Sequence, residues 1–320
     1  MADETALWTW FLFHAGLSPQ RAKTLLESWD QRGLTLRAVL EALPPQANAL
    51  GLTPEEAAKL RPPRDLPDGA ALRWNEPLYP LGLRQLPLKL RPALLFYTGE
   101  LSLLMRPIIY LAPGPLDAET QELMQETVSI LLGENLLLAA FRESPQAALL
   151  LEEMTASEGE ALLFAKQGLA RLTLPEQEHA LAQAGRLLIL SPLSPTTPPN
   201  PALDDVLQQV AAGAALRTVY NSPPEKTEPG VTALLLTASP TAHAPQNLRV
   251  VTHAAEAALW LTERPVAPAS AVLPTPTTAS SFDLTADPPT DPPPTPAEAL
   301  RVLEKGGRVP EALKKRLFGG

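Results

Sequence analysis

Residues 74–104 read WNEPLYPLGLRQLPLKLRPALLFYTGELSLL. In this stretch Tyr79-Pro80 and Arg91-Pro92 keep the residue before each proline out of the helical region of backbone space. A short apolar and aromatic run follows from Ala93 and is closed by Gly99, which is typical of a strand. Another apolar run covers Ile108 to Ala112. The stretch therefore predicts an extended arm and two strands that enter an α/β sheet.

Strand-like and helix-like segments then alternate along the chain. The strand candidates are 94–97, 108–112, 136–140, 161–165, 187–190, 216–220, 233–237 and 248–251. The helix candidates are 116–132, 145–153, 175–184, 201–212 and 254–262. This alternation predicts an α/β fold with a Rossmann-like, mostly parallel sheet covered by helices. Several strand candidates are continuous apolar runs, so we expect them to be buried on both faces.

The first 65 residues predict a small helical domain in which one motif occurs twice. Gly16-Leu17-Ser18-Pro19 recurs as Gly51-Leu52-Thr53-Pro54. Ser or Thr suits the N-cap of a helix and Pro suits its first turn. The spacing resembles SAM-like or helix-hairpin-helix units, whose backbone amides can hold a phosphate. The simpler interpretation is two well-capped helices, and the pattern favours it over a phosphate site. Arg21 and Lys23 make the first hairpin the better phosphate candidate.

The C-terminal part changes composition after a core domain predicted at 66–264. Residues 265–296 hold 10 prolines in 32 positions, which predicts a disordered linker. Residues 297–320 predict a short helical tail with the basic run Lys314-Lys315-Arg316. Three roles stay open for this tail: docking to a partner, weak anchoring to nucleic acid, or a solvated helix.

Composition excludes several classes of protein. The 320 residues include no cysteine, so disulfide scaffolds, cysteine zinc sites and cysteine nucleophiles are excluded. The acidic N-terminus and the absence of an 18-residue apolar run predict no signal peptide and no membrane span, in line with a cytoplasmic protein. The four histidines lack metal-ligand spacing, and nucleotide-binding and hydrolase motifs are absent. We therefore expect that the protein is not an enzyme and that it holds no cofactor and no metal ion.

The order of residues in the opening stretch resembles the entry to the core domain of the DprA/Smf family of DNA-processing proteins. Members have a tyrosine-proline pair, a leucine, a proline-led strand ending in tyrosine and glycine, and a leucine-rich link to the first core strand. The matching residues are Tyr79, Pro80, Leu83, Pro92, Leu94, Leu95, Tyr97, Gly99 and Leu101. A weaker match extends over roughly residues 5–262. The resemblance implies a homodimer that binds single-stranded DNA and loads a RecA-type recombinase.

The resemblance also locates the family's polar ligand residues, and most of them differ here. The family's Gly-Ser-Arg falls at Ala112-Pro113-Gly114-Pro115, and its Ser-Gly-x-Ala-x-Gly-Ile-Asp falls at residues 139–146, AAFRESPQ. Its Gly-Leu-Asp turn falls at Gly168-Leu169-Ala170, and its Arg-Asn-Arg helix start falls at Leu207-Gln208-Gln209. The hydrophobic pattern and the turns persist, while the guanidinium, carboxylate and most hydroxyl groups are replaced.

Charge also weighs against phosphate binding in this region. Residues 111–264 carry 8 basic and 18 acidic side chains, a net charge of −10, which should repel DNA. Three basic residues remain near the expected site: Arg142, Lys166 and Arg171. Two interpretations stay open: these residues form a small cationic patch, or they are separate surface cations, which is the more common case. The candidate nucleic-acid-binding residues are Gly16, Ser18, Arg21, Lys23, Gly114, Arg142, Lys166 and Gly168.

Three functional hypotheses follow. The first is a divergent DprA-like protein that binds single-stranded DNA and assists recombinase loading in DNA uptake and recombination. The second is a DprA-like scaffold that has lost DNA binding and acts as a protein-interaction module. The third is a Rossmann-like domain that senses a small nucleotide, which the missing glycines disfavour.

Overall fold

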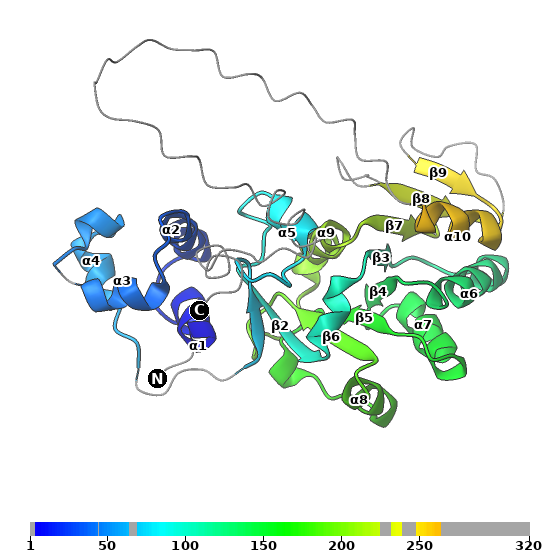
Figure 1. Ribbon diagram of the computed structural model, residues 1–320, viewed down its shortest axis with the longest axis horizontal. Helices are drawn as coiled ribbons and strands as arrows, with labels where there is room; N and C mark the ends of the chain where they lie inside the picture. The colour runs from blue at the N-terminus through cyan, green and yellow to red at the C-terminus, as the bar shows by residue number, and fades with distance from the viewer. Residues whose placement is uncertain (1–3, 44, 64–68, 225–231, 239–247, 264–320) are drawn as a thin grey trace, which may run out of the picture. The chain divides into compact units, whose positions relative to one another are not determined.

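The computed structural model describes residues 4–263 except 44, 64–68, 225–231 and 239–247 (Figure 1). The described residues all belong to one compact unit within Met1–Arg264. The predicted linker and tail lie outside the described residues. The helical segment predicted at 1–65 and the core predicted at 66–264 fall within the same compact unit.

Among the described residues, nine strands form one sheet in the order β1-β2-β6-β5-β4-β3-β7-β8-β9. The strands are β1 Ala71–Arg73, β2 Leu94–Gly99, β3 Ile108–Leu111, β4 Leu137–Phe141, β5 Ala161–Phe164, β6 Leu187–Ser191, β7 Arg217–Tyr220, β8 Ala233–Leu236 and β9 Leu248–Val251. All neighbours from β6 to β9 pair in parallel. The predicted mostly parallel sheet is therefore confirmed.

The entry strand β2 does not lie beside β3, the strand that follows it in the sequence. It pairs antiparallel with β6, and the short strand β1, which the sequence pattern missed, pairs antiparallel with β2. Gly99 ends β2 with φ +100°, and a Cβ there would lie 2.0 Å from the Leu187 carbonyl oxygen. Only glycine fits this close approach between two backbones.

In the part of the chain that the structure describes, four helices precede the first strand, one follows the last strand, and the others lie between strands. They are α1 Glu4–Phe13, α2 Pro19–Gln31, α3 Leu36–Ala42, α4 Pro54–Lys59, α5 Leu81–Gln85, α6 Ala118–Leu132, α7 Pro145–Ala156, α8 Glu176–Gln183, α9 Asp204–Ala214 and α10 Ala254–Thr262. Short 3₁₀ turns are η1 Asn48–Leu50, η2 Leu101–Met105, η3 Leu169–Arg171 and η4 Pro201–Leu203.

Two features of the helices bear on the sequence predictions. Ser18 caps α2, and Thr53 with Glu56 forms a capping box on α4, so both predicted N-caps are confirmed. The prediction of an extended arm is wrong in part, because helix α5 begins immediately after Pro80. Proline restricts the residue before it and does not prevent a helix that starts after it.

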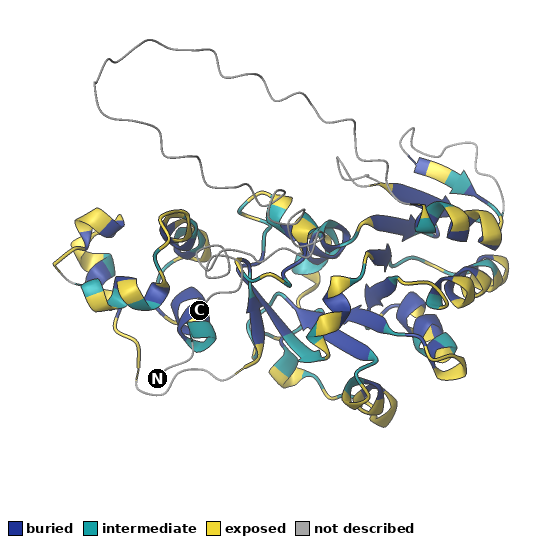
Figure 2. Cartoon of the chain, viewed as in Figure 1, coloured by how far each residue is buried: buried dark blue, intermediate teal, exposed yellow. Residues whose placement is uncertain are grey.

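The central strands are buried on both faces, as predicted (Figure 2). One face carries an aromatic cluster in which Tyr110 makes T-shaped contacts with Phe141 and Phe164, at centroid distances of 6.0 and 6.3 Å. This face belongs to the same core as α5, α9 and the N-terminal helices. The opposite face packs against α6, α7, α8 and α10.

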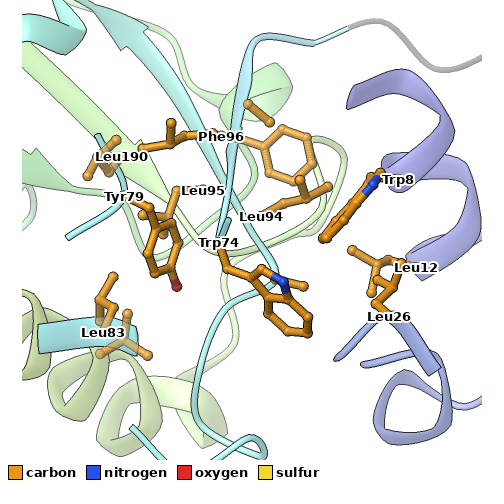
Figure 3. Packing of buried hydrophobic residues seen from close by; sticks show 14 of the residues in the cluster. Trp8, Leu12, Leu26, Trp74, Tyr79, Leu83, Leu94, Leu95, Phe96 and Leu190 are labelled. Atoms are coloured by element: carbon orange, nitrogen blue, oxygen red, sulfur yellow. The ribbon is translucent and has the colours of Figure 1, made fainter. Parts of the chain in front are cut away.

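The opening stretch forms the seam between the N-terminal helices and the sheet (Figure 3). Trp74 meets Trp8 edge to face at 5.7 Å, and Phe96 meets Phe13 at 6.1 Å. The buried hydroxyl of Tyr79 donates to the Pro92 carbonyl at 2.6 Å. The residues that carry the family resemblance therefore have a structural role: they pack the N-terminal helices against strands β1 and β2 at the edge of the sheet.

Candidate functional site

The carboxyl ends of the parallel strands gather four of the eight candidate residues at one edge of the sheet. Gly114 follows β3, Arg142 follows β4, and Lys166 and Gly168 follow β5. The chain order reverses between β3 and β7, which are neighbours in the sheet. In open α/β sheets, ligands bind at the carboxyl edge beside such a reversal. The predicted place for a site is therefore present, and its chemistry depends on the side chains.

Arg142 is held in an internal ion pair. Its Nε donates to Glu178 Oε2 at 2.7 Å, and its Nη2 donates to the Thr173 carbonyl at 3.1 Å. The side chains of Arg142 and Glu178 are only 16% and 8% exposed. Glu178 lies on α8, so this pair ties the end of β4 to that helix. A phosphate would have to compete with a nearly buried carboxylate for the guanidinium.

Lys166 is held in the same way. Its Nζ donates to Asp204 Oδ2 at 2.7 Å and lies 5.4 Å from the centre of the Phe141 ring. Asp204 begins α9, where an acidic side chain also suits the helix dipole. The two candidate cations at this edge are thus neutralised by carboxylates from later helices, while the third cation expected here, Arg171, donates its Nε to the Thr196 carbonyl at 2.5 Å.

The two candidate glycines permit close packing of the chain. A Cβ on Gly168 would lie 2.1 Å from the Ser194 carbonyl oxygen, and the Gly168 amide already donates to the Thr197 carbonyl at 2.8 Å. A Cβ on Gly114 would lie 2.6 Å from Asn221 Oδ1. The glycines therefore admit neighbouring protein atoms at the places where a phosphate loop would admit a ligand.

A buried amide network closes the space between β3, β4 and β7. Gln146 is fully buried, and its Nε2 donates to the Gly114 carbonyl at 2.9 Å and to Asn221 Oδ1 at 3.2 Å. Asn221 in turn donates to the Pro115 carbonyl. Sequence reasoning missed both amides. The available signal was that Gln146 stands where the family pattern has its aspartate.

The first N-terminal hairpin is also internally bonded. Gly16 has φ +74°, which fits the turn, and Ser18 Oγ accepts from the Arg21 amide at 3.3 Å. The Arg21 guanidinium grips Glu56 through two bonds of 2.8 and 2.9 Å and also donates to the Gly51 carbonyl at 2.6 Å. These bonds, with one from the Thr53 amide, lower the pKa of Glu56 to about 2. Arg21 thus clamps the two repeated motifs together.

Lys23 faces a different part of the molecule from Arg21. Its Nζ lies 3.4 Å from the carbonyl oxygens of Leu88 and Lys89, beside the seam. Burial, with the nearby charge of Arg91, lowers the pKa of Lys23. Positions two apart on a helix point to different sides, so the structure does not bring Lys23 and Arg21 into one phosphate site.

One cavity opens beside this closed edge, at the chain reversal itself. Its volume is about 380 Å³. It is lined by Tyr110, Ala112, Pro113, Asp205, Gln208, Gln209, Ala212, Tyr220, Ser222 and Pro224.

Of the described residues, none form a group of three or more side chains able to hold a metal ion. Within the same residues, no helix is long and apolar enough to span a membrane.

Comparison with solved structures identifies the fold. DNA processing protein A (DprA) from Streptococcus pneumoniae matches with a TM-score of 0.63 at 15% identity, over 82% of this chain and 100% of the other. DprA from Helicobacter pylori, solved for its single-stranded DNA binding mode, matches with a TM-score of 0.46 at 11% identity, over 60% and 94% of the two chains. No family model and no curated protein matches the sequence. The chain has the DprA fold.

Proposed function

We propose that this chain is a DprA-like DNA-processing protein whose partner is single-stranded DNA. The observation that carries the proposal is the match to pneumococcal DprA, which extends over the whole of that chain. The residues around Tyr79-Pro80 support it from the sequence side, since they resemble the family's core entry. Homodimer formation, loading of a RecA-type recombinase and a cytoplasmic location are finer parts of the same proposal.

The route for DNA must differ from one that uses the carboxyl edge, because Arg142 and Lys166 are paired there. Exposed cations at the end of α4 offer a better first contact. Lys59 and Arg61 are exposed, and the Lys59 side chain lies beside the Gly16 turn, 4.0 Å from where a Cβ would stand. Cations that neutralise phosphates supply most of the affinity of sequence-independent binding.

A fluorescence-anisotropy titration with a single-stranded oligonucleotide tests this proposal. We expect binding at about 50 mM salt that weakens steeply by about 200 mM. The double variant Lys59→Glu/Arg61→Glu should weaken binding. Arg249→Glu, on β9 outside the N-terminal region, is the control for a charge reversal elsewhere on the surface and should bind as the parent does. Failure of the parent protein to bind at the lower salt would exclude DNA as its partner.

A second candidate function is a protein-interaction scaffold with the DprA fold and no DNA binding. The closed carboxyl edge favours it: both edge cations are paired, and Gln146 and Asn221 fill the space between strands. The same titration separates the candidates. A well-folded protein that binds no oligonucleotide at low salt, yet captures a purified RecA-type recombinase, would support the scaffold.

A further inference from the structure

The N-terminal helices form a groove next to the cations Lys59 and Arg61. The groove lies between α3 and α4, which are neighbours in Figure 1, and has a volume of about 550 Å³. Among the described residues that line it, all but Asn48 and Arg61 are apolar, Leu40 and Ala58 included. The volume lies within the range of ligand pockets. This α3–α4 groove is therefore large enough to hold a small ligand or one unit of a polymer.

The cations at the end of α4 are available to an anion. Within the ranges that the structure describes, the lysines and arginines whose side chains make no hydrogen bond and no ion pair are Lys59, Arg61 and Lys89. All three are exposed, and Arg61 lines the α3–α4 groove itself. A phosphate that binds Lys59 or Arg61 breaks no internal bond, whereas at the carboxyl edge of the sheet it would have to displace a carboxylate.

The carboxylates of this region do not line the groove. Glu56 is held by Arg21, which neutralises its charge. Glu41 and Glu55 are exposed on α3 and α4, and neither belongs to the groove lining. Arg32, whose guanidinium donates to a carbonyl of η1 at 3.0 Å, adds a further positive charge nearby. The charges closest to the groove therefore favour an anionic ligand.

The shape and chemistry of the groove suit a nucleobase better than a partner helix. Helix α4 has only six residues, whereas a docked helix uses anchors from i to i+7. Leucine and proline side chains contact bases in protein–DNA complexes. The exposed amide of Asn48, which makes no hydrogen bond in the described part of the chain, can bond the edge of a base. A duplex keeps its bases stacked inside, so a base that enters the groove comes from a single strand.

We propose that the α3–α4 groove takes an unstacked base of single-stranded DNA, while Lys59 and Arg61 bind the phosphates on either side of it. The inference rests on the proposed function and adds the part of the strand that the groove recognises. Phosphate contacts alone would not distinguish a strand with bases from one without them. The groove supplies that distinction through its apolar lining and Asn48.

Two strands with the same phosphates separate the groove from the cations. The first is a short oligothymidylate, and the second is an abasic strand of equal length, which carries no bases. Anisotropy titrations of the full chain at about 50 mM salt measure both affinities. We expect the parent protein to bind oligothymidylate about tenfold more tightly, the gain from burying roughly 55 Å² of apolar surface.

Variants of the groove should change the preference for bases, and variants of the cations should not. Ala58→Leu fills the groove at an exposed helical position without changing charge, and should reduce the preference to about twofold. Asn48→Ala, also at an exposed position, should reduce it about threefold. Lys59→Glu should weaken the binding of both strands alike.

Each variant has a matched control. Ala38→Leu makes the same change at an exposed position of α3 outside the groove lining, and should keep the preference for bases. Lys89→Glu reverses an exposed cation that also lacks an internal partner and lies outside the groove lining, and should bind both strands as the parent does. Urea midpoints close to that of the parent show that each variant is folded.

The outcomes distinguish failure of this inference from failure of the proposed function. Equal binding of the two strands by the parent protein, or an unchanged preference in Ala58→Leu and Asn48→Ala, overturns the inference and leaves DNA as the partner. If neither strand binds at about 50 mM salt, the proposed function fails and the inference fails with it. If Ala58→Leu keeps the preference for bases and loses binding to a purified RecA-type recombinase, the groove serves a protein, and the inference is again overturned.

Discussion

The ion pairs of Arg142 and Lys166 decide whether the carboxyl edge can attract a phosphate. The double variant Glu178→Gln/Asp204→Asn removes both partners and frees two cations. We expect tighter binding of single-stranded DNA and a salt dependence steeper by about 0.7 per freed cation. Anisotropy titrations at several salt concentrations measure both quantities.

The control for this prediction removes two negative charges and frees no cation. Glu176 lies two residues from Glu178 on α8, and Asp205 lies next to Asp204 on α9. The variant Glu176→Gln/Asp205→Asn therefore has the same net charge as the test variant. An equal gain in both proteins would show that general electrostatics, and not release of the cations, controls binding.

The clamp between Arg21 and Glu56 should contribute to stability only above a certain pH. Its bonds lower the pKa of Glu56 from 4.5 to about 2. A carboxyl with a depressed folded-state pKa stabilises the protein fully above its unfolded pKa, and this contribution disappears as pH falls through the folded value. The urea midpoint of the parent protein should therefore fall between pH 4.5 and 2. We expect the midpoint of the Glu56→Gln variant to fall much less over the same range, because a glutamine does not titrate. Glu55→Gln, one residue away and exposed, should keep it.

At the residue scale, the sequence predicted hydrogen bonds between residues close together in the chain and missed ion pairs between residues far apart in it. The caps at Ser18 and Thr53 were predictable because the bonded amide lies three residues along the chain. The partner of Arg142 was not, because Glu178 lies 36 residues away and reaches it only through the packing of α8. Candidate cations chosen by their place in the sequence carry no information on whether a carboxylate already holds them.

Helices α5 and α9 pack through two glycines, which makes their contact sensitive to a single methyl group. A Cβ on Gly82 would lie 2.1 Å from the Gly213 carbonyl oxygen, which is fixed backbone. We expect Gly82→Ala to lower the free energy of unfolding by about 1–3 kcal/mol, the usual cost of overpacking. Gly133→Ala is the control: its Cβ would come no closer than 3.4 Å to the Ile130 carbonyl oxygen, and its backbone is already helical. Equal urea midpoints for the two variants would contradict the packing argument.

At the scale of elements, apolar runs predicted most strands correctly because a strand buried on both faces has no other composition available. Strand order was a different matter. The position of β2 beyond β6 depends on backbone pairing with Leu187 to Ser191, which no local pattern encodes. Helix α5 was missed because five residues are too few to show helical periodicity.

The cavity at the chain reversal is a property of the whole molecule. Its walls come from the end of β3, from residues along α9, and from the end of β7 with the segment that follows it. The sequence revealed which charged groups of the family pattern are replaced, at Leu207 and Gln209, but not that Tyr110 would line the remaining space. That required the register that sets Tyr110 in the aromatic face of the sheet.

One core joins the N-terminal helices to the sheet, so residues 4–263 should unfold together. Trp8, Phe11 and Trp29 share a hydrophobic cluster with Trp74 and the strands. Because domains with a common core unfold cooperatively, 5-fluorotryptophan labels should report one urea midpoint by ¹⁹F NMR. Trp8 and Trp29 report the helices, while Trp260 lies on α10, on the opposite face of the sheet. A second test uses Trp74→Ala, which in a single cooperative unit should lower the midpoints reported by the N-terminal tryptophans and by Trp260 alike. A lower midpoint for the N-terminal tryptophans alone, with the Trp260 midpoint unchanged by Trp74→Ala, would mean that residues 1–65 fold as a separate domain.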